Sequence, residues 1–223
     1  MAQPSKEYDI VVMEDVMIPA RDGIGLATDL YFPAIGQGVV QEPLPIILER
    51  TPYNKRSPDR VEKSARFFAR QGYVYAFQDC RGCYQSQGQM DFFWQEGPDG
   101  YDTVEWLAAQ PWSNKKIGTT GTSYMGWTQN SLAALNPAHL TCMWVNEAAW
   151  NGYTSSLRQG GALELRWLCW LCWHAALNTN SELKSNPAVA AALNQLDIKQ
   201  ILWNLPLKKG LTPLAYAPSY EKR

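Results

Sequence analysis

Apolar runs of strand length alternate with amphipathic stretches of helix length from Asp9 to Val145. Alternating polar and apolar positions predict strands at Asp9–Ile18 and Leu26–Tyr31, joined by a turn at Arg21–Gly23. Further strands are predicted at Pro45–Arg50, Tyr73–Asp79, Lys116–Thr120 and Leu140–Val145. Helices are predicted at about Pro58–Arg70, at about Gly100–Ala109 and from the residue after Ser123 to about Leu135. The Gly- and Pro-rich segment Pro33–Pro45 is predicted to be a loop.

Strands that alternate with helices of this length indicate a mostly parallel sheet with helices on both faces. Ligands of such sheets bind beyond the carboxyl ends of the strands. Ser123, Tyr53 and Asp79 each follow a predicted strand at that edge. We therefore expect these three residues to lie near one another.

From Gly152 onward the pattern changes to helices without strands, predicted at Leu157–Leu177 and Pro187–Leu196, followed by a less regular tail that contains several prolines. Gly160–Gly161 is a candidate hinge between the two regions. The most apolar segment, Trp167–Leu177, is shorter than the roughly 20 residues that cross a bilayer. It is therefore interpreted as a buried helix.

Composition narrows the function. The 223 residues are enough for one domain with a sizeable core. The 20 basic and 21 acidic residues nearly cancel, which argues against a partner such as nucleic acid or an acidic membrane surface. The polar start, Met1–Asp9, lacks the apolar run of a secretory signal and favours a cytoplasmic location. Ten Trp and eleven Tyr suit either aromatic-lined pockets or a large core.

Two Cys-x-x-Cys pairs, Cys80/Cys83 and Cys169/Cys172, bring zinc into consideration because four thiolates can bind that metal. The pairs are much further apart than those of zinc ribbons. The second pair also lies in a Trp- and Leu-rich helical pattern, where cysteines usually pack as small apolar residues. A disulfide is not expected in a chain without an export signal. The sequence therefore predicts neither a metal nor a cofactor.

The segment Lys116–Trp127 combines a strand, a Gly-Thr-Ser-Tyr-Met-Gly turn and the start of a helix. A serine at such a turn is how α/β-hydrolases hold a nucleophile, because the strained backbone exposes the hydroxyl. Glycines are needed on both sides, since a Cβ would clash with the tightly turned chain. Ser123 is therefore a candidate nucleophile. The alternative is a serine that only caps the helix.

The serine turn is one of six short sequence motifs along the chain. They are Pro19–Gly23, Leu26–Tyr31, Arg50–Lys55, Gln78–Gly82, Asp99–Leu107 and Gly121–Gly126. Together they resemble the CocE/NonD acyl-esterase family, relatives of the Xaa-Pro dipeptidyl-peptidases, in which the serine turn reads Gly-x-Ser-Tyr-x-Gly. The resemblance covers residues 10–150, and the later helices match the family's cap domain by position only.

The resemblance implies an α/β-hydrolase fold, incomplete, with its first six strands in residues 1–155 and the start of a helical cap in 156–223. It implies that Ser123 attacks an acyl carbonyl of an ester, amide or peptide substrate and forms an acyl-enzyme. The oxyanion then needs two donors about 3 Å away. The backbone N–H of Tyr124 and the hydroxyl of Tyr53 match the family's donors. The alternative for Tyr53 is an aromatic residue packed under a Pro turn.

Four charged residues in the matching blocks are expected to be structural. Asp79 and Arg81 match the family's Asp-x-Arg-Gly, and we expect an Asp–Arg pair that fixes a loop. Asp99 and Asp102 lie at a predicted helix start, where carboxylates cap N–H groups and interact with the helix dipole.

A serine needs a base and an orienting carboxylate, which follow it in α/β-hydrolases in the order Ser, Asp, His. The chain has two histidines. His139 follows a helix that carries the chain roughly 18 Å away from Ser123, so we expect it at the opposite edge of the sheet. His174 lies in the Trp-rich helix with no Asp between it and Ser123, and Asp197 comes too late. Both histidines are interpreted as structural, with His174 as the alternative base.

We therefore expect the N-terminal part of a longer serine hydrolase, with the triad Asp and His beyond Arg223, a partly uncovered sheet edge and no turnover by this chain alone. Two competing hypotheses remain. The first is a non-catalytic α/β domain that serves as a binding module, and the second is a zinc-dependent protein. The sequence does not indicate the substrate or the oligomeric state. Trp127, Trp150 and the Trp167/Trp170/Trp173 cluster are candidates for an aromatic acyl pocket, although the spacing of the cluster favours a core stripe.

Overall fold

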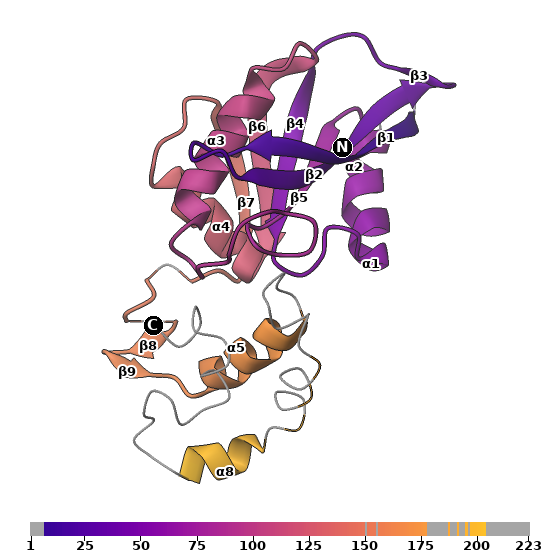
Figure 1. Cartoon of the computed structure of the whole chain (residues 1–223). Coiled ribbons are helices and arrows are strands. Elements are labelled where there is room, and N and C mark those ends of the chain that lie inside the picture. Colours follow the sequence, from indigo (N-terminus) through magenta and orange to yellow (C-terminus); the bar gives the residue numbers. More distant parts are fainter. Residues whose placement is uncertain are drawn as a thin grey trace.

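A computed structural model describes residues 7–149, 151–154, 156–177, 187, 191, 195 and 197–203. A twisted sheet with helices on either side occupies the upper part of Figure 1, and helices α5 (Arg166–Leu177) and α8 (Ile198–Trp203) lie below it. The predicted helix at Pro187–Leu196 falls largely outside the described residues, and the proline-containing tail falls outside them. None of the helices in the described part of the chain is long and apolar enough to cross a membrane.

The main sheet contains seven strands. They are β1 (Asp9–Pro19), β2 (Gly25–Ile35), β3 (Gly38–Val39), β4 (Leu44–Thr51), β5 (Val74–Asp79), β6 (Ser113–Thr122) and β7 (Leu140–Asn146). Their order is β1-β2-β5-β4-β6-β7, with β3 paired to β2.

The sheet is mixed, whereas the sequence predicted a mostly parallel one. Strand β2 pairs antiparallel with β1, β3 and β5, while β5, β4, β6 and β7 pair in parallel. The short turn between β1 and β2 is the reason, because a connection of a few residues can join only antiparallel neighbours. The parallel half brings the carboxyl ends of β4, β5, β6 and β7 to one edge.

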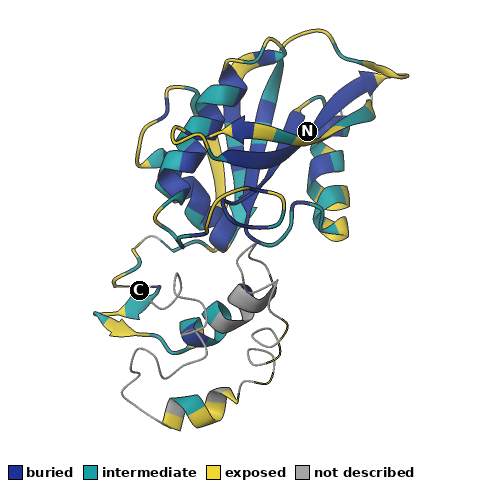
Figure 2. Cartoon of the chain, viewed as in Figure 1, coloured by how far each residue is buried: buried dark blue, intermediate teal, exposed yellow. Residues whose placement is uncertain are grey.

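Two apolar cores cover the two faces of the sheet. Along β5, Val74 and Ala76 pack with Val104 and Leu107 of α3 (Glu96–Ala108). The alternate residues of β5, among them Tyr75, face a helical run on the other side. That run comprises α1 (Pro58–Arg60), a π-helical turn η1 (Val61–Arg66) and α2 (Phe67–Arg70). Figure 2 shows β2 and β5 dark blue because both of their faces are buried.

The end of β2 and the start of α3 differ from the sequence prediction. Strand β2 continues through Pro33, whose carbonyl accepts the N–H of Val40 at 3.0 Å, so the predicted loop is shorter. Helix α3 starts at Glu96 rather than near Gly100. Both boundaries depend on contacts with other segments of the chain. The local order of apolar and polar residues does not reveal such contacts.

The segment Leu157–Leu177 is not a single helix. Strands β8 (Arg158–Gln159) and β9 (Ala162–Leu163) pair antiparallel, and only then does α5 begin. Gly160 and Gly161 have φ angles of 56° and 94° and form the two-residue turn of this hairpin, instead of the expected hinge. A turn with positive φ at both central residues favours glycine, so the Gly-Gly pair was a hairpin signal.

The outermost strand of the parallel half, β7, is exposed along nearly its whole length. Met143, Trp144 and Val145 retain 38%, 73% and 37% of their accessible surface. The expected uncovered sheet edge is therefore present, because β6 is the one partner of β7 among the strands that the structure describes.

Candidate active site

Ser123 stands between β6 and helix α4 (Tyr124–Ala133) with φ 62° and ψ −118°. Its N–H donates to the carbonyl of Asn146 at the end of β7 at 3.0 Å, and its carbonyl accepts the N–H groups of Gly126 and Trp127. The predicted strand–turn–helix arrangement is confirmed. The serine side chain is exposed and makes no capping hydrogen bond to α4, so the interpretation of Ser123 as a helix cap is wrong.

Two glycines permit this turn for different reasons. Gly121 has φ 142°, and a Cβ there would lie 2.4 Å from the Cβ of Met125. A Cβ on Gly126 would lie 2.4 Å from the Cβ of Ala148, which follows β7. The first glycine therefore serves the turn itself, and the second lets α4 approach the neighbouring strand.

Tyr53 lies in the loop after β4, and its half-buried side chain lines the same cavity as Ser123. Its N–H donates to Oγ1 of Thr51 at 3.0 Å, and its ring meets the Tyr124 ring edge-on at a centroid distance of 6.3 Å. Burial raises the pKa of the Tyr53 hydroxyl. The hydroxyl is therefore protonated at neutral pH and able to donate a hydrogen bond.

A fully buried lysine holds the Tyr53 loop in place. The ammonium of Lys55 lies 2.7 Å from Asp15, 3.3 Å from Asp79 and 3.5 Å from Asp29, and its backbone N–H donates to Asp79 at 2.8 Å. Three elements, β1, β2 and β5, thus supply carboxylates to one cation. The predicted Asp79–Arg81 pair is wrong, because Asp79 is engaged by Lys55.

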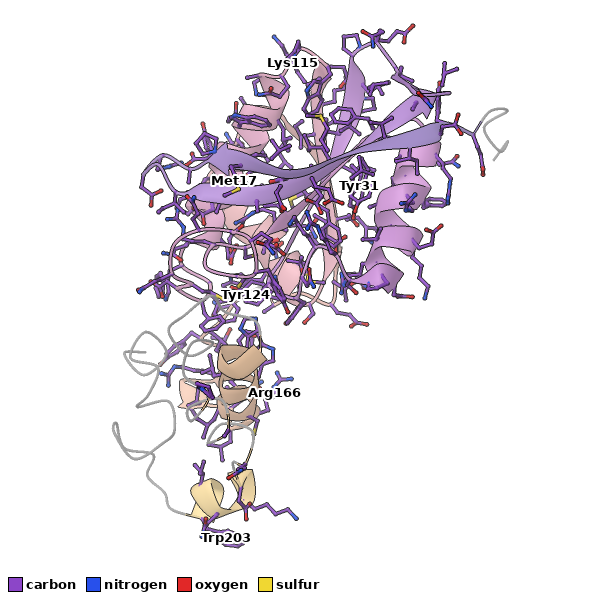
Figure 3. The ribbon with its side chains drawn as sticks, turned by 45° about the vertical axis from the view of Figure 1, so that its right-hand side comes forward. Met17, Tyr31, Lys115, Tyr124, Arg166 and Trp203 are labelled. Carbon is purple, nitrogen blue, oxygen red and sulfur yellow. The ribbon has the colours of Figure 1, made fainter. Side chains whose placement is uncertain are left out.

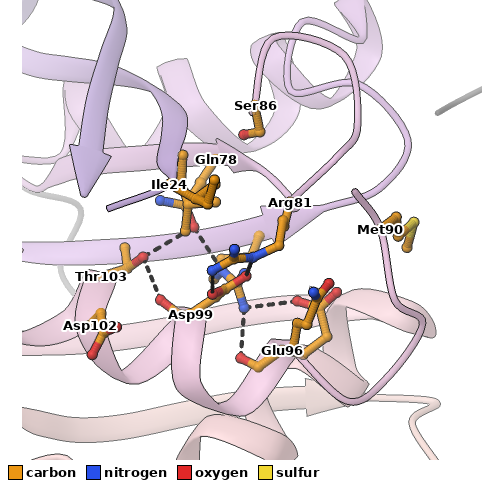
Figure 4. Close-up of polar contacts among 12 residues, drawn as sticks. Ile24, Gln78, Arg81, Ser86, Met90, Glu96, Asp99, Asp102 and Thr103 are labelled. Carbon is orange, nitrogen blue, oxygen red and sulfur yellow. Dashed lines mark hydrogen bonds and ion pairs between the residues drawn. The ribbon is translucent and has the colours of Figure 1, made fainter. Parts of the chain in front are cut away.

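Arg81 instead bridges two other carboxylates. It lies 2.7 Å from Asp22 and 2.6 Å from Asp99, and Figure 4 shows the second contact. Asp102 pairs with Arg21 at 2.8 Å. The prediction that the aspartates of α3 cap the helix is therefore wrong. They attach the turn between β1 and β2 to α3 instead.

A buried chain of polar contacts lies beneath the serine turn. Arg50, at the end of β4, is 2.9 Å from the carboxylate of Glu96 and donates to its backbone carbonyl at 2.8 Å. The hydroxyl of Tyr124 donates to Glu96 at 2.9 Å. Burial raises the pKa of Tyr124 well above its ordinary value, which keeps the hydroxyl a donor. Because Tyr124 opens α4, its backbone N–H is not required by the helix's own hydrogen-bond ladder.

The serine opens into a cavity of about 320 Å³ between the sheet edge and α5. Figure 3 shows Tyr124 at this junction, with Arg166 on the α5 side. The aromatic lining residues are Tyr53, Phe93, Tyr124, Trp127, Trp167 and Trp170. The other lining residues are Ser123, Glu147, Ala148, Ala149, Ser156 and Arg166.

Trp167 and Trp170 both line the cavity, and Trp170 also packs against the apolar core beside Tyr124, so the interpretation of the Trp cluster as a core stripe holds in part for Trp170. Trp150 and the side chain of Trp173 lie outside the described residues. Sequence reasoning missed Phe93, Glu147 and Arg166, which line the cavity from three separate segments. No periodic pattern or motif marks them.

Neither histidine is among the residues that line the cavity. His139 precedes β7 at the opposite edge of the sheet, as predicted, and its Nδ1 is 2.7 Å from Glu105. His174 is completely buried, with ring centroids 4.7 Å from Trp170 and 5.8 Å from Tyr53. Desolvation lowers the pKa of His174 from 6.5 to about 3. A hydrogen bond with the Pro52 backbone raises this pKa, but its effect is smaller than that of desolvation. His174 is therefore neutral.

The thiols of Cys80 and Cys83 belong to the apolar core beside Tyr124. Burial raises the pKa of Cys80 well above its ordinary value, so it remains a thiol. Within the described part of the chain, no three His, Cys, Asp or Glu side chains are grouped so as to hold a metal ion.

Comparison with known proteins identifies the family. Residues 22–212 match the model of the X-Pro dipeptidyl-peptidase (S15) family. The chain belongs to this family. Cocaine esterase from Rhodococcus sp. (strain MB1 Bresler) is 32% identical over 219 residues, which are 93% of this chain and 36% of that protein. The S15 chain thus spans little more than a third of the length of this relative.

Solved structures show the same fold. An α-amino acid ester hydrolase is 29% identical, with a TM-score of 0.56 over 70% of this chain and 28% of that one. A CocE/NonD family hydrolase from Staphylococcus aureus superposes with a TM-score of 0.67 over 84% of this chain and 36% of that one, at 24% identity. The S15 chain therefore has an α/β-hydrolase fold, as predicted.

Replacing Arg50 by Met should lower the free energy of unfolding by about 3–5 kcal/mol, because Glu96 is left as a buried charge without its cation. Urea denaturation measures the change. Lys63→Met is the matched control: its ammonium pairs with Asp59 but is 74% exposed, so the loss should stay below about 0.5 kcal/mol. Equal losses in the two variants would contradict the role assigned to Arg50.

Gly126→Ala should destabilise the protein by about 1–3 kcal/mol, because the new Cβ must push the end of β7 away from α4. Gly38→Ala is the control, since a Cβ there meets only one atom, at 3.8 Å. Thermal unfolding compares the two variants. A neutral Gly126→Ala would show that α4 and the chain after β7 are not in contact.

The buried neutral His174 should make stability depend on pH. Its folded pKa lies below the unfolded value of 6.5, so the unfolded state binds more protons and stability falls as the pH drops from about 6.5 toward 3. Between pH 7.5 and 5.5 the wild type should lose about 1 kcal/mol more than His174→Phe. Urea titrations at both pH values test this, and parallel pH dependences would mean that His174 is charged or solvated when folded.

Proposed function

We propose that this chain carries the nucleophile and the oxyanion hole of a serine hydrolase that acts on ester or amide bonds. The observation that supports the proposal most is the exposed Ser123 at a strained strand-to-helix turn, opening into the cavity that Tyr53 also lines. Strained residues of this kind persist where the surrounding structure holds them for a function.

In the proposed reaction, the hydroxyl oxygen of Ser123 attacks the carbonyl carbon and the carbonyl electrons move to oxygen. The hydroxyl proton passes to a general base, which returns it to the leaving alcohol or amine. The backbone N–H of Tyr124 and the hydroxyl of Tyr53 donate to that oxyanion. The tetrahedral intermediate then expels the alcohol or amine and leaves an acyl-enzyme, which water hydrolyses. The raised pKa of Tyr53 suits this role, because a donor must keep its proton.

An ester is the favoured substrate. The two relatives of highest identity named above, cocaine esterase and α-amino acid ester hydrolase, both carry names of ester-cleaving enzymes. We also propose that residues 1–155 supply the nucleophile and the oxyanion donors, while 156–223 begin a cap that supplies one wall of the cavity through Trp167 and Trp170.

The activating base is proposed to come from outside the cavity lining, which contains no histidine. His174 packs its ring against Tyr53 and Trp170 and is not among the residues that line the cavity. The chain alone should therefore react slowly. The same observation favours the second candidate, a non-catalytic domain that binds small molecules at this cavity.

Labelling with a fluorophosphonate, read by intact mass, tests the proposal. The purified chain should label slowly by itself and faster as imidazole is added to act as the base, always at Ser123. Ser123→Ala should not label. Tyr53→Phe should label about 10²–10³-fold more slowly, because one oxyanion donor is lost.

Three outcomes are informative. Fast labelling at Ser123 without imidazole would support the nucleophile and place a base within this chain. Labelling that imidazole does not accelerate, at the rate of an ordinary serine, would favour the non-catalytic domain. Equal rates for the wild type and Tyr53→Phe would remove Tyr53 from the oxyanion hole.

A further inference from the structure

The backbone and the side chain of Tyr53 are held by different parts of the chain. The sheet region fixes the backbone of its loop, because the Tyr53 N–H donates to Oγ1 of Thr51 at 3.0 Å and the Lys55 N–H donates to Asp79 at 2.8 Å. These contacts leave the side-chain torsions of Tyr53 undetermined, and those torsions decide where the hydroxyl lies. The ring and the hydroxyl are therefore positioned by other groups.

The ring of Tyr53 packs against one ring from the serine turn and one from α5. It meets the Tyr124 ring at a centroid distance of 6.3 Å and the His174 ring at 5.8 Å, edge-on in both cases. Trp170 packs against the same two partners, 5.9 Å from Tyr124 and 4.7 Å from His174. Because Trp170 and His174 are four residues apart on α5, their side chains lie on one face of that helix.

Both α5 residues also make polar contacts with the Tyr53 loop. His174 is hydrogen-bonded to the backbone of Pro52, the residue before Tyr53. Burial raises the pKa of the Tyr53 hydroxyl, and a smaller opposing effect comes from a hydrogen bond with the Trp170 side chain. An indole N–H can only donate, so the Tyr53 oxygen accepts and keeps its own proton available for a second partner. A hydroxyl that accepts a hydrogen bond is also a stronger donor.

We propose that α5 positions the side-chain oxyanion donor of this site: Trp170 orients the hydroxyl of Tyr53, and His174 fixes the loop that carries it. Both are positioning residues, because each acts on the oxyanion through Tyr53. The inference rests on the proposed function, in which Tyr53 is an oxyanion donor. It adds that the sheet region does not complete the oxyanion hole by itself, since a helix from the later part of the chain places one of the two donors.

Fluorophosphonate labelling in the presence of imidazole, with single and double variants, tests whether Trp170 acts through Tyr53. Trp170→Phe keeps an aromatic ring and removes the N–H, so it should slow labelling of Ser123 about tenfold, as expected for one lost hydrogen bond. In the Tyr53→Phe background the same change should have no further effect, because the acceptor is gone. Trp167→Phe is the matched control. The Trp167 N–H donates to the Ser156 carbonyl at 2.8 Å, so its loss should change the rate by the same factor in both backgrounds.

The indole N–H resonances give a second readout, which requires no reaction at Ser123. In NMR spectra of the isotopically labelled chain, Tyr53→Phe should shift the Trp170 indole resonance, which is assigned by its loss in Trp170→Phe. The Trp167 indole resonance should stay in place. His174→Phe keeps a ring and removes the bond to Pro52, so it should slow labelling only where Tyr53 is present.

The outcomes separate this inference from the proposed function. If Tyr53→Phe slows labelling but Trp170→Phe slows it equally in both backgrounds, the positioning role is overturned and the oxyanion role of Tyr53 stands. An unmoved Trp170 resonance in Tyr53→Phe would also overturn the inference. If Tyr53→Phe labels at the wild-type rate, the proposed function loses its side-chain donor and the positioning role falls with it.

Discussion

The buried ion pair between Arg50 and Glu96 organises the functional edge of the molecule. Arg50 is the penultimate residue of β4 and Glu96 begins α3. The hydroxyl of Tyr124, the first residue of α4, donates to Glu96. One buried contact thus joins the strand that leads to Tyr53 with the helix that follows Ser123. Two buried charges are costly to desolvate, so the arrangement is stable only if both partners and their hydrogen bonds are kept together.

A second buried cation, Lys55, is likewise stabilised by carboxylates, which come from the neighbouring strands. Lys55 gathers Asp15, Asp29 and Asp79 around an ammonium with no exposed surface. Removing any one carboxylate would leave the lysine less compensated, so the cluster favours a single geometry for the Tyr53 loop. Fixed positions at this edge suit oxyanion stabilisation, in which the donors must be in place before charge develops.

The cavity combines a rigid sheet edge with residues from later in the chain. Trp167 and Trp170 of α5 face the serine turn, and His174 of the same helix packs behind them as a neutral ring. Glu147, which follows the exposed strand β7, also lines the cavity, as does Arg166, whose Nε pairs with Glu164.

The sequence by itself determined the features that depend on near neighbours along the chain. Strand and helix periodicity located most elements, and small residues around Ser123 predicted its turn because their steric requirement is local. The sequence did not reveal which charged residues form ion pairs. Arg21 pairs with Asp102 across 81 positions, and Asp79 pairs with Lys55 rather than Arg81. The direction of β2, the cavity positions of Phe93 and Glu147, and the burial of His174 were likewise decided by tertiary structure. Ion pairs and cavity linings form only when segments distant in the sequence pack together. The order of apolar and polar residues along one strand is compatible with several such packing arrangements, so it does not select among them.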